Sequence, residues 1–302
     1  MAIQLATAQV GRTPLRVTRL GLGAAPLSYT PGAEGEEQAL QAVQMAWELG
    51  IRFIDMAPMY GYGEAERRVG AALRQLPRQD FVLETKVRRP SRAWGEHEQP
   101  PRGIFVPDYG REAILRGITS SLERLGVDHV DIVLVHDPDL FYQDALDQAF
   151  PTLAGLRDQG VIGAIGAGMN QWQMEDKFLQ YADPDCFLLA SRYTLLEQGA
   201  LGFLERCQQR QVSVFLGGVF NTGILATGAV PGARYSYREA PPEILEKVRR
   251  IEAICQQYAT PLAAAALQFA AAHPAVAALV LGMATPQEVV QDLEMWQWPI
   301  PP

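Results

Sequence analysis

Four ionisable side chains in the first half of the chain have the chemistry needed to transfer a proton. Asp55, Lys86 and His136 each end a short apolar segment (IRFID, FVLETK and VDIVLVH), and Tyr60 follows Asp55 by five residues. A phenol is a weak acid at neutral pH, but a nearby ammonium group stabilises the phenolate and lowers the phenol pKa. Lys86 can supply the ammonium group, Asp55 a carboxylate that holds it, and His136 a hydrogen bond to a substrate oxygen. The set predicts a site for acid–base catalysis.

Each of these residues also has an ordinary structural interpretation. An Asp at a strand end is often a turn or capping residue, a Lys can extend to solvent, and a His before a loop can simply begin that loop. The catalytic interpretation depends on the pattern, because three successive apolar segments end in an ionisable residue. If those segments are neighbouring strands of a parallel sheet, their carboxyl ends bring the side chains together.

Apolar segments bounded by turn residues alternate along the chain with segments of helical spacing. Nearly continuous apolar segments are typical of strands buried on both faces, and the alternation is typical of βα units around a parallel sheet. Eight strands are expected, at 20–24, 51–55, 81–86, 130–136, 161–167, 186–191, 212–217 and 276–282.

The helical segments have one apolar face each. The first, 36–50, places Leu40, Val43 and Trp47 on one side and ends at Gly50, which suits the left-handed conformation past a helix end. Two further helices begin at Glu64 and Arg111, and the others are expected at 144–159, 172–181, 199–210, 242–258, 262–272 and 286–296, with Pro261 and Pro286 at first helical positions.

Eight strands with crossover helices predict an α/β fold, a (β/α)8 TIM barrel in which residues 1–302 form a single domain. A doubly wound open sheet is the alternative architecture. It is disfavoured because the first strand-to-helix connection, GLGAAPLSYTPGAEGEE, lacks a G-x-G-x-x-G that leads directly into a helix.

Composition limits the classes of partner and location. The formal net charge of −8 argues against nucleic acid, which requires clustered Lys and Arg. No window reaches the roughly 18 apolar residues of a membrane span and no signal peptide is recognisable, so we expect a cytoplasmic protein without membrane contact. Cys186, Cys207 and Cys255 lack the paired spacing of a zinc site or a disulfide framework and are expected to be free thiols.

The chain resembles the aldo-keto reductase superfamily over nearly its whole length. In FIDMAPMYGYGEAERRVGAAL, ETK and VLVHDPD, the family's Asp, Tyr, Lys and His tetrad falls on Asp55, Tyr60, Lys86 and His136. The segments ERLGVDHVDIVLVHDPD, IGAGMNQW, LASRYTLLEQ and GGVFNTGILA are similar to a branch that contains aldose 1-dehydrogenases, such as L-fucose and D-threo-aldose dehydrogenases, and pyridoxal 4-dehydrogenases. The resemblance implies metal-free hydride transfer between a nicotinamide and a carbonyl or hemiacetal carbon, with Tyr60 as general acid or base.

The resemblance also implies a cofactor site between the loop after the seventh strand and the helix after the eighth. Glycines in the first of these regions would let backbone amides approach phosphate oxygens, although glycines also serve tight turns. The candidate cofactor-binding residues are Gly23, Asp55, Asn170, Gly217, Gly218, Phe220, Gly223, Gly282, Met283, Thr285 and Glu288.

NAD is favoured over NADP as the cofactor. The segment GMATPQEVVQDLEM contains no Lys or Arg, whereas recognition of the 2′-phosphate of NADP requires cations. Arg192 or Arg234 from another loop is the alternative source of such a cation. Thr285 and Glu288 have the spacing of a helix capping box, and the resemblance additionally implies that Glu288 lies near the adenine amine.

The sequence departs from the usual family pattern around the nicotinamide. It has Gly-Met-Asn at 168–170 where Ser-Asn is common, Ala190 and Ser191 near the usual Gln, and Gly217 where a stacking Tyr is common. We therefore expect the nicotinamide ring to be packed differently here, with Asn170 as a displaced candidate for holding the carboxamide.

The predicted reaction is NAD-dependent oxidation of an aldose to a lactone, with a small sugar or aldehyde as the partner molecule. A long connection at 87–110 is expected to overhang the site, and its candidate substrate contacts are Arg88, Arg89, Trp94, His97, Phe105 and Tyr109. An exposed variable loop without contact to the substrate is the alternative interpretation of this segment. An NADPH-dependent aldehyde reductase and a pyridoxal 4-dehydrogenase are the enzymatic alternatives. A cofactor-sensing binding subunit is the non-enzymatic one, and the intact tetrad argues against it.

Overall fold

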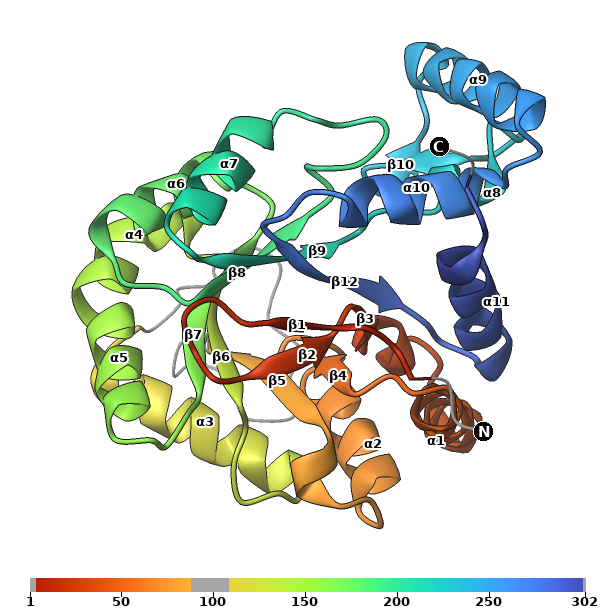
Figure 1. The fold of residues 1–302 in the computed structure, drawn as a ribbon. Coiled ribbons are helices and arrows are strands. Elements are labelled where there is room, and N and C mark those ends of the chain that lie inside the picture. The colour runs from red at the N-terminus through yellow and green to blue at the C-terminus, as the bar shows by residue number, and fades with distance from the viewer. Residues whose placement is uncertain (1–3, 88–108, 301–302) are drawn as a thin grey trace.

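A closed barrel of parallel strands forms the centre of the computed structural model, which describes residues 4–87 and 109–300 (Figure 1). Successive barrel strands are neighbours, and β12 closes the ring between β9 and β3. The predicted (β/α)8 barrel is confirmed. Its strands are β3 (Leu20–Gly23), β4 (Phe53–Asp55), β5 (Val82–Val87), β6 (Ile132–His136), β7 (Ala164–Met169), β8 (Cys186–Ala190), β9 (Ser213–Gly217) and β12 (Val276–Gly282).

Helices surround the barrel as an outer layer (Figure 1). Gly50 has a φ of 89° just past the first of them, the left-handed conformation that the sequence predicts there. The helices are α1 (Gly32–Glu48), α2 (Glu64–Leu73), α3 (Arg111–Leu125), α4 (Tyr142–Asp144), α5 (Phe150–Asp158), α6 (Trp172–Tyr181), α7 (Leu201–Gln209), α8 (Ile224–Thr227), α9 (Pro242–Gln257), α10 (Leu262–Ala271) and α11 (Pro286–Gln297).

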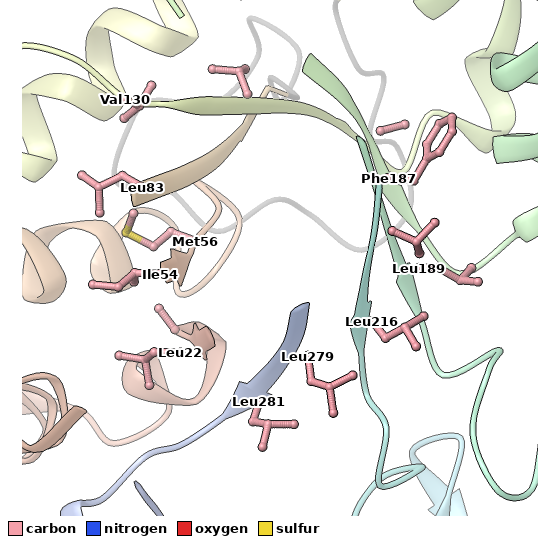
Figure 2. Close-up of a cluster of buried hydrophobic side chains, with 14 of the residues drawn as sticks. Leu22, Ile54, Met56, Leu83, Val130, Phe187, Leu189, Leu216, Leu279 and Leu281 are labelled. Atoms are coloured by element: carbon pink, nitrogen blue, oxygen red, sulfur yellow. The ribbon is translucent and has the colours of Figure 1, made fainter. Parts of the chain in front are cut away.

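The outward faces of the barrel strands form the main hydrophobic core. Because successive side chains of a strand point to opposite faces, alternate residues pack against the helices. Leu22, Ile54, Leu83, Leu216 and Leu281 belong to this outer cluster, and Figure 2 shows them on β3, β4, β5, β9 and β12.

The inward faces of the strands form a second hydrophobic cluster inside the barrel. Phe53, Ile132 and Phe215 belong to it, together with Val10 and Val17 from the N-terminal region. Val17 lies on β2 (Arg16–Thr18), which pairs antiparallel with β1 (Thr7–Gln9). This hairpin closes the amino-terminal end of the barrel, so a ligand site is expected at the opposite end, where the strands have their carboxyl ends.

The structure differs from the predicted elements in several places. The hairpins β1–β2 and β10–β11 (Arg234–Tyr235 and Arg238–Glu239) and helix α8 were not predicted, because elements of two to four residues carry too little periodicity to detect. The expected helix at 144–159 is interrupted by a π-helical segment, Ala145–Ala149. Strand β7 begins and ends later than predicted, and Pro261 is the N-cap of α10 rather than its first residue, whereas Pro286 does begin α11.

Candidate active site

The carboxyl ends of three adjacent strands carry the predicted ionisable residues. Asp55 is the last residue of β4, Lys86 the penultimate residue of β5 and His136 the last residue of β6. All three side chains point into the barrel. Asp55 is on the same strand face as Phe53, and His136 is on the same face as Ile132 and Leu134, all of which belong to the inward cluster. Lys86 pairs in register with Leu134 and so shares that direction. Tyr60 lies in the turn that follows β4. The barrel therefore brings residues that are 81 positions apart, Asp55 to His136, to one rim.

Lys86 is the centre of the group. Its side chain is 1% exposed, and Nζ donates hydrogen bonds to Asp55 Oδ1 and to the Met56 carbonyl, the latter at 2.9 Å. Nζ also lies 3.4 Å from Glu84 Oε1. Burial disfavours the charged amine, but Asp55, Tyr60 and Glu84 more than compensate, so the pKa of Lys86 is raised. Lys86 is an ammonium group at neutral pH.

Tyr60 lies between the ammonium group and the imidazole. Lys86 Nζ is 5.2 Å from the centroid of its ring, and the His136 ring meets it edge-on with the centroids 5.9 Å apart. Burial raises the pKa of Tyr60, and the Lys86 charge opposes that rise without cancelling it. The expected lowering by Lys86 is present, but the expected low net pKa is wrong. Desolvation of the phenolate outweighs one ammonium group that is already paired with Asp55.

His136 stands at the outer side of the group. Its side chain is 12% exposed, and Nε2 lies 3.7 Å from Asp137 Oδ2. Tyr109, which was expected to contact substrate, is buried and donates a hydrogen bond from its hydroxyl to the His136 carbonyl at 3.1 Å. Tyr109 therefore supports the backbone of the rim. The other residues expected in that connection, Arg88, Arg89, Trp94, His97 and Phe105, lie outside the described residues.

Small residues occupy the inward rim positions of the remaining strands. Gly23 pairs in register with Asp55 on one side and Gly282 on the other, Gly168 pairs with His136, and Gly217 pairs with Ala190. A Cβ at Gly217 would make only ordinary contacts, at 3.5 Å from Leu188 and 3.8 Å from Ala190. These strands therefore present their backbone, rather than long side chains, toward the tetrad.

Gly218 and Gly223, which follow β9, lie in different structural environments. Gly218 has a φ of 59°, and a Cβ there would lie 2.2 Å from Ser191 Oγ, so a tight turn accounts for it. Gly223 has a φ of 94° at the start of α8, and a Cβ there would meet nothing within 4 Å. Phe220 between them is partly buried against the core. Gly223 is thus the glycine in this loop with open space beside its backbone.

The residues after β12 form a helix cap. Thr285 Oγ1 accepts a hydrogen bond from the Glu288 amide at 3.2 Å, and Glu288 Oε2 accepts one from the Ala284 amide at 2.5 Å. The capping interpretation of this pair is confirmed, with the Glu288 carboxylate bound to the amide one residue before the N-cap.

Two other candidate cofactor residues lie elsewhere on the rim. Met283 is fully buried, and Asn170, after β7, donates from Nδ2 to the Ala190 carbonyl at 3.1 Å.

The two arginines considered for a phosphate both bind backbone carbonyls. Arg192 donates to the Ser191 carbonyl at 3.1 Å, and Arg234 donates to the Tyr237 carbonyl at 2.6 Å.

Two residues of the site were missed by sequence reasoning. Glu84 lies two residues before Lys86 on β5, and this spacing on a strand places both on one face. Gly168 was noted only as part of an unusual motif, but a Cβ there would lie 3.3 Å from Lys86 Cε. The first was detectable from the alternation in FVLETK, and the second required the packing.

Across residues 4–87 and 109–300, no group of three or more His, Cys, Asp or Glu side chains is arranged to hold a metal ion. Among the helices of those same residues, none is long and apolar enough to cross a membrane.

Comparison with known proteins gives one family for most of the chain. The model of the Aldo/keto reductase family matches residues 19–302. A pyridoxal 4-dehydrogenase from Microbacterium luteolum is 36% identical over 97% of this chain and 93% of its own, and a D-threo-aldose 1-dehydrogenase from a Pseudomonas species is 36% identical over 95% and 92%. An aldo-keto reductase structure from Bacillus halodurans, in its holo form, has the same fold, with a TM-score of 0.78 over 99% of this chain and 93% of that chain at 23% identity.

Proposed function

Since this chain belongs to the aldo/keto reductase family and is an NAD(P)-dependent oxidoreductase, we propose that it oxidises the hemiacetal carbon of a small aldose to the lactone. Tyr60 exchanges the proton in this reaction. The observation that carries the proposal is the buried Lys86 ammonium group, which is bound to Asp55 and lies 5.2 Å from the Tyr60 ring at the carboxyl ends of the barrel strands.

The roles of the four residues follow from their contacts. In oxidation, Tyr60 takes the proton of the anomeric hydroxyl, and in reduction it returns a proton to the carbonyl oxygen. Lys86 stabilises the phenolate form of Tyr60, and Asp55 keeps Lys86 charged and in place. His136, edge-on to the Tyr60 ring, donates a hydrogen bond to the substrate oxygen. When bound, the nicotinamide supplies the carbon that accepts or returns the hydride.

The residues present fit a dinucleotide at this end of the barrel. Backbone amides after β9, beside the open space at Gly223, suit pyrophosphate oxygens. At the N-terminus of α11, Pro286 has no N–H, and the Ala284 and Glu288 amides already donate to the capping groups. Gly217 leaves a face for the nicotinamide ring without a stacking side chain, and Asn170 lies after β7 where its amide can orient the carboxamide.

The cofactor we propose is NAD. No Lys or Arg lies between Gly282 and Gln297, so the adenosine end of the site lacks a local cation for a 2′-phosphate. We expect kcat/KM with NAD⁺ to exceed that with NADP⁺ by about tenfold or more, the scale of a charge-assisted contact. The reverse preference would mean that another loop supplies the cation, with Arg192 and Arg234 as the first positions to mutate.

The function is tested with a panel of L-fucose, other aldoses and pyridoxal, each assayed with NAD⁺ and NADP⁺. We expect lactone formation from at least one aldose. Tyr60→Phe should lower kcat by at least about a hundredfold while leaving the Kd for NADH, measured by fluorescence titration, nearly unchanged. An enzyme that reduces aromatic aldehydes with NADPH but oxidises no aldose would refute the proposed substrate class. Undiminished turnover in Tyr60→Phe would refute the proposed mechanism.

Pyridoxal is the second candidate substrate. The relative named pyridoxal 4-dehydrogenase is as similar to this chain as the aldose dehydrogenase, at 36% identity. Pyridoxal also forms an internal hemiacetal, so the same residues would oxidise the same kind of carbon. The relative kcat/KM for L-fucose and pyridoxal in one preparation separates the two candidates.

A further inference from the structure

A buried carboxyl group lies under the proposed catalytic pair and has no role in the mechanism above. Glu84 is 0% exposed and faces the inside of the barrel from β5, two residues before Lys86. Its Cα partner on β4 is Asp55, and its Cα partner on β6 is Ile132 of the inward apolar cluster. The carboxyl group is therefore placed against Asp55 and Lys86 rather than toward solvent.

The charges around Glu84 do not balance if it is ionised. Within residues 4–87 and 109–300, the ionisable groups that face it are Asp55 on β4, Lys86 on its own strand, Tyr60 in the turn after β4 and Cys186 across the barrel on β8. Burial raises the pKa of the Cys186 thiol and that of the Tyr60 phenol, so both are neutral. One ammonium group would then face two buried carboxylates, which is a costly arrangement.

The polar contacts of Glu84 point to the same conclusion. Lys86 already donates to Asp55 and to the Met56 carbonyl, and it stands 3.4 Å from Glu84. Among the described residues, no donor makes a well-formed hydrogen bond to either carboxyl oxygen of Glu84. A carboxylate needs donors, whereas a carboxylic acid is itself a donor and needs an acceptor. Asp55, adjacent in register, supplies that acceptor.

We propose that Glu84 is a positioning residue of this site: its carboxyl group stays protonated and donates a hydrogen bond to Asp55, which holds Asp55 against Lys86. The role rests on the proposed function, because it acts on the Lys86–Tyr60 pair only through Asp55. The pKa of Glu84 supports it, since burial and the adjacent Asp55 charge raise that pKa well above the usual range. The cluster then carries one positive and one negative charge, with a neutral acid and a neutral phenol beside them.

Two substitutions distinguish a protonated, positioning Glu84 from an ionised Glu84 and from a Glu84 with a purely structural role. Glu84→Gln keeps a donor and the neutral state, so kcat, KM and the pH profile should stay within about threefold of wild type. Glu84→Leu removes the donor, and kcat should fall about tenfold or more with little change in KM, the factor expected for one hydrogen bond to a charged group. In Glu84→Leu, the pH at which oxidation sets in should also move upward, because a displaced Lys86 stabilises the Tyr60 phenolate less.

Stability provides the control for a merely structural role. Glu84→Leu leaves buried Asp55 without this donor, which should lower the Tm. Turnover is therefore compared at a temperature well below the Tm of both variants, where Glu84→Leu should still be slower than Glu84→Gln. A loss of turnover that appears only near the Tm would overturn the proposal.

An infrared spectrum tests the protonation state without any substrate. At neutral pH, the difference spectrum between wild type and Glu84→Gln should contain the carbonyl band of a protonated carboxyl group. Glu175, a fully buried acid on α6 whose pKa burial also raises, is the matched control, because Glu175→Gln should remove a separate band and leave turnover intact.

The outcomes distinguish the two proposals. A carboxylate band at Glu84, or a Glu84→Gln enzyme whose oxidation sets in at lower pH, would show an ionised Glu84 and overturn the positioning role. Wild-type kcat and pH profile in Glu84→Leu would also overturn it, while the proposed function stands if Tyr60→Phe is inactive. If Tyr60→Phe is fully active, the proposed function itself fails.

Discussion

At the site, a single buried ammonium group has to satisfy several acceptors in a confined space. Lys86 Nζ reaches Asp55, the Met56 carbonyl and the neighbourhood of Glu84, and its methylene chain passes Gly168. The geometry leaves little tolerance for extra atoms beside that chain. Substitutions that move Lys86 slightly are therefore as informative as substitutions that remove it.

Gly168→Ala tests this tolerance. The new Cβ would lie 3.3 Å from Lys86 Cε and 3.4 Å from Leu134, so Lys86 must shift by a few tenths of an ångström. We expect kcat to fall about tenfold, because small displacements of a catalytic group are costly. Steady-state kinetics measure the effect. Gly155→Ala in α5, where a Cβ meets nothing within 4 Å, is the control and should leave kcat unchanged. Equal rates in both variants would contradict the packing argument.

The ionisation of Tyr60 predicts opposite pH dependences for the two directions. Because burial raises the pKa of Tyr60, the phenol keeps its proton through neutral pH. Oxidation needs the phenolate, so its kcat/KM should increase steadily as pH rises above neutral. Reduction needs the phenol, so its kcat/KM should stay constant near neutral pH and fall only in alkaline buffer. Steady-state rates in both directions across one buffer series measure this, and an oxidation rate that levels off below neutral pH would contradict it.

Among the elements, β5 is held from outside as well as from inside the barrel. Glu66 of α2 is fully buried, and its carboxylate accepts hydrogen bonds from Thr85 Oγ1 of β5 and from Arg124 Nε of α3, both at 2.7 Å. Thr85 stands between Glu84 and Lys86 in sequence and points to the opposite face. One side chain thus ties two helices to the strand that carries the ammonium group.

Glu66→Ala should destabilise the fold. The substitution leaves Thr85 and Arg124 without this acceptor, and because Arg124 is about one-third exposed we expect a loss of about 2 kcal/mol rather than the larger cost of a fully buried pair. Urea denaturation measures it. Glu36→Ala, which removes the exposed ion pair with Arg67, is the control and should cost less than about 0.5 kcal/mol. A smaller loss for Glu66→Ala than for its control would contradict the structural role of the buried carboxylate.

In the molecule as a whole, the hairpin that stabilises the barrel and the residues of the candidate active site lie at opposite ends. The amino-terminal end of the barrel is closed by the β1–β2 hairpin, with Val10 and Val17 fully buried in the inward cluster. The hairpin is bound to the barrel by a hydrogen bond from the Gly11 amide to Ser213 Oγ at 2.7 Å. The tetrad and the small rim residues lie at the other end.

Val17→Ala tests this separation. Removal of two buried methyl groups should lower the free energy of unfolding by about 2 kcal/mol. The kcat and KM values should match wild type at a temperature where both proteins are folded, because the substitution lies at the end opposite the site. Thermal denaturation and steady-state assays on the same preparations provide both measurements, and a large change in kcat without a change in Tm would contradict the separation.

The sequence alone determined the order and type of the barrel elements and which residues gather at the rim. Both rest on short-range patterns: apolar strands alternate with amphipathic segments, and Asp55, Lys86 and His136 stand at successive strand ends. In a parallel barrel, those two facts suffice to bring the side chains together. The small hairpins β1–β2 and β10–β11 escaped prediction because they are too short to show a period.

Tertiary structure decided the electrostatics and the packing around those residues. The sequence contains an ammonium group and a phenol, but only their burial shows that the pKa of Tyr60 rises despite Lys86. It contains Glu84 and Gly168, but only the closed barrel places one against Asp55 and the other against the Lys86 side chain. The physical reason is that desolvation and steric contact depend on every atom that surrounds a group, and most of those atoms come from distant parts of the chain.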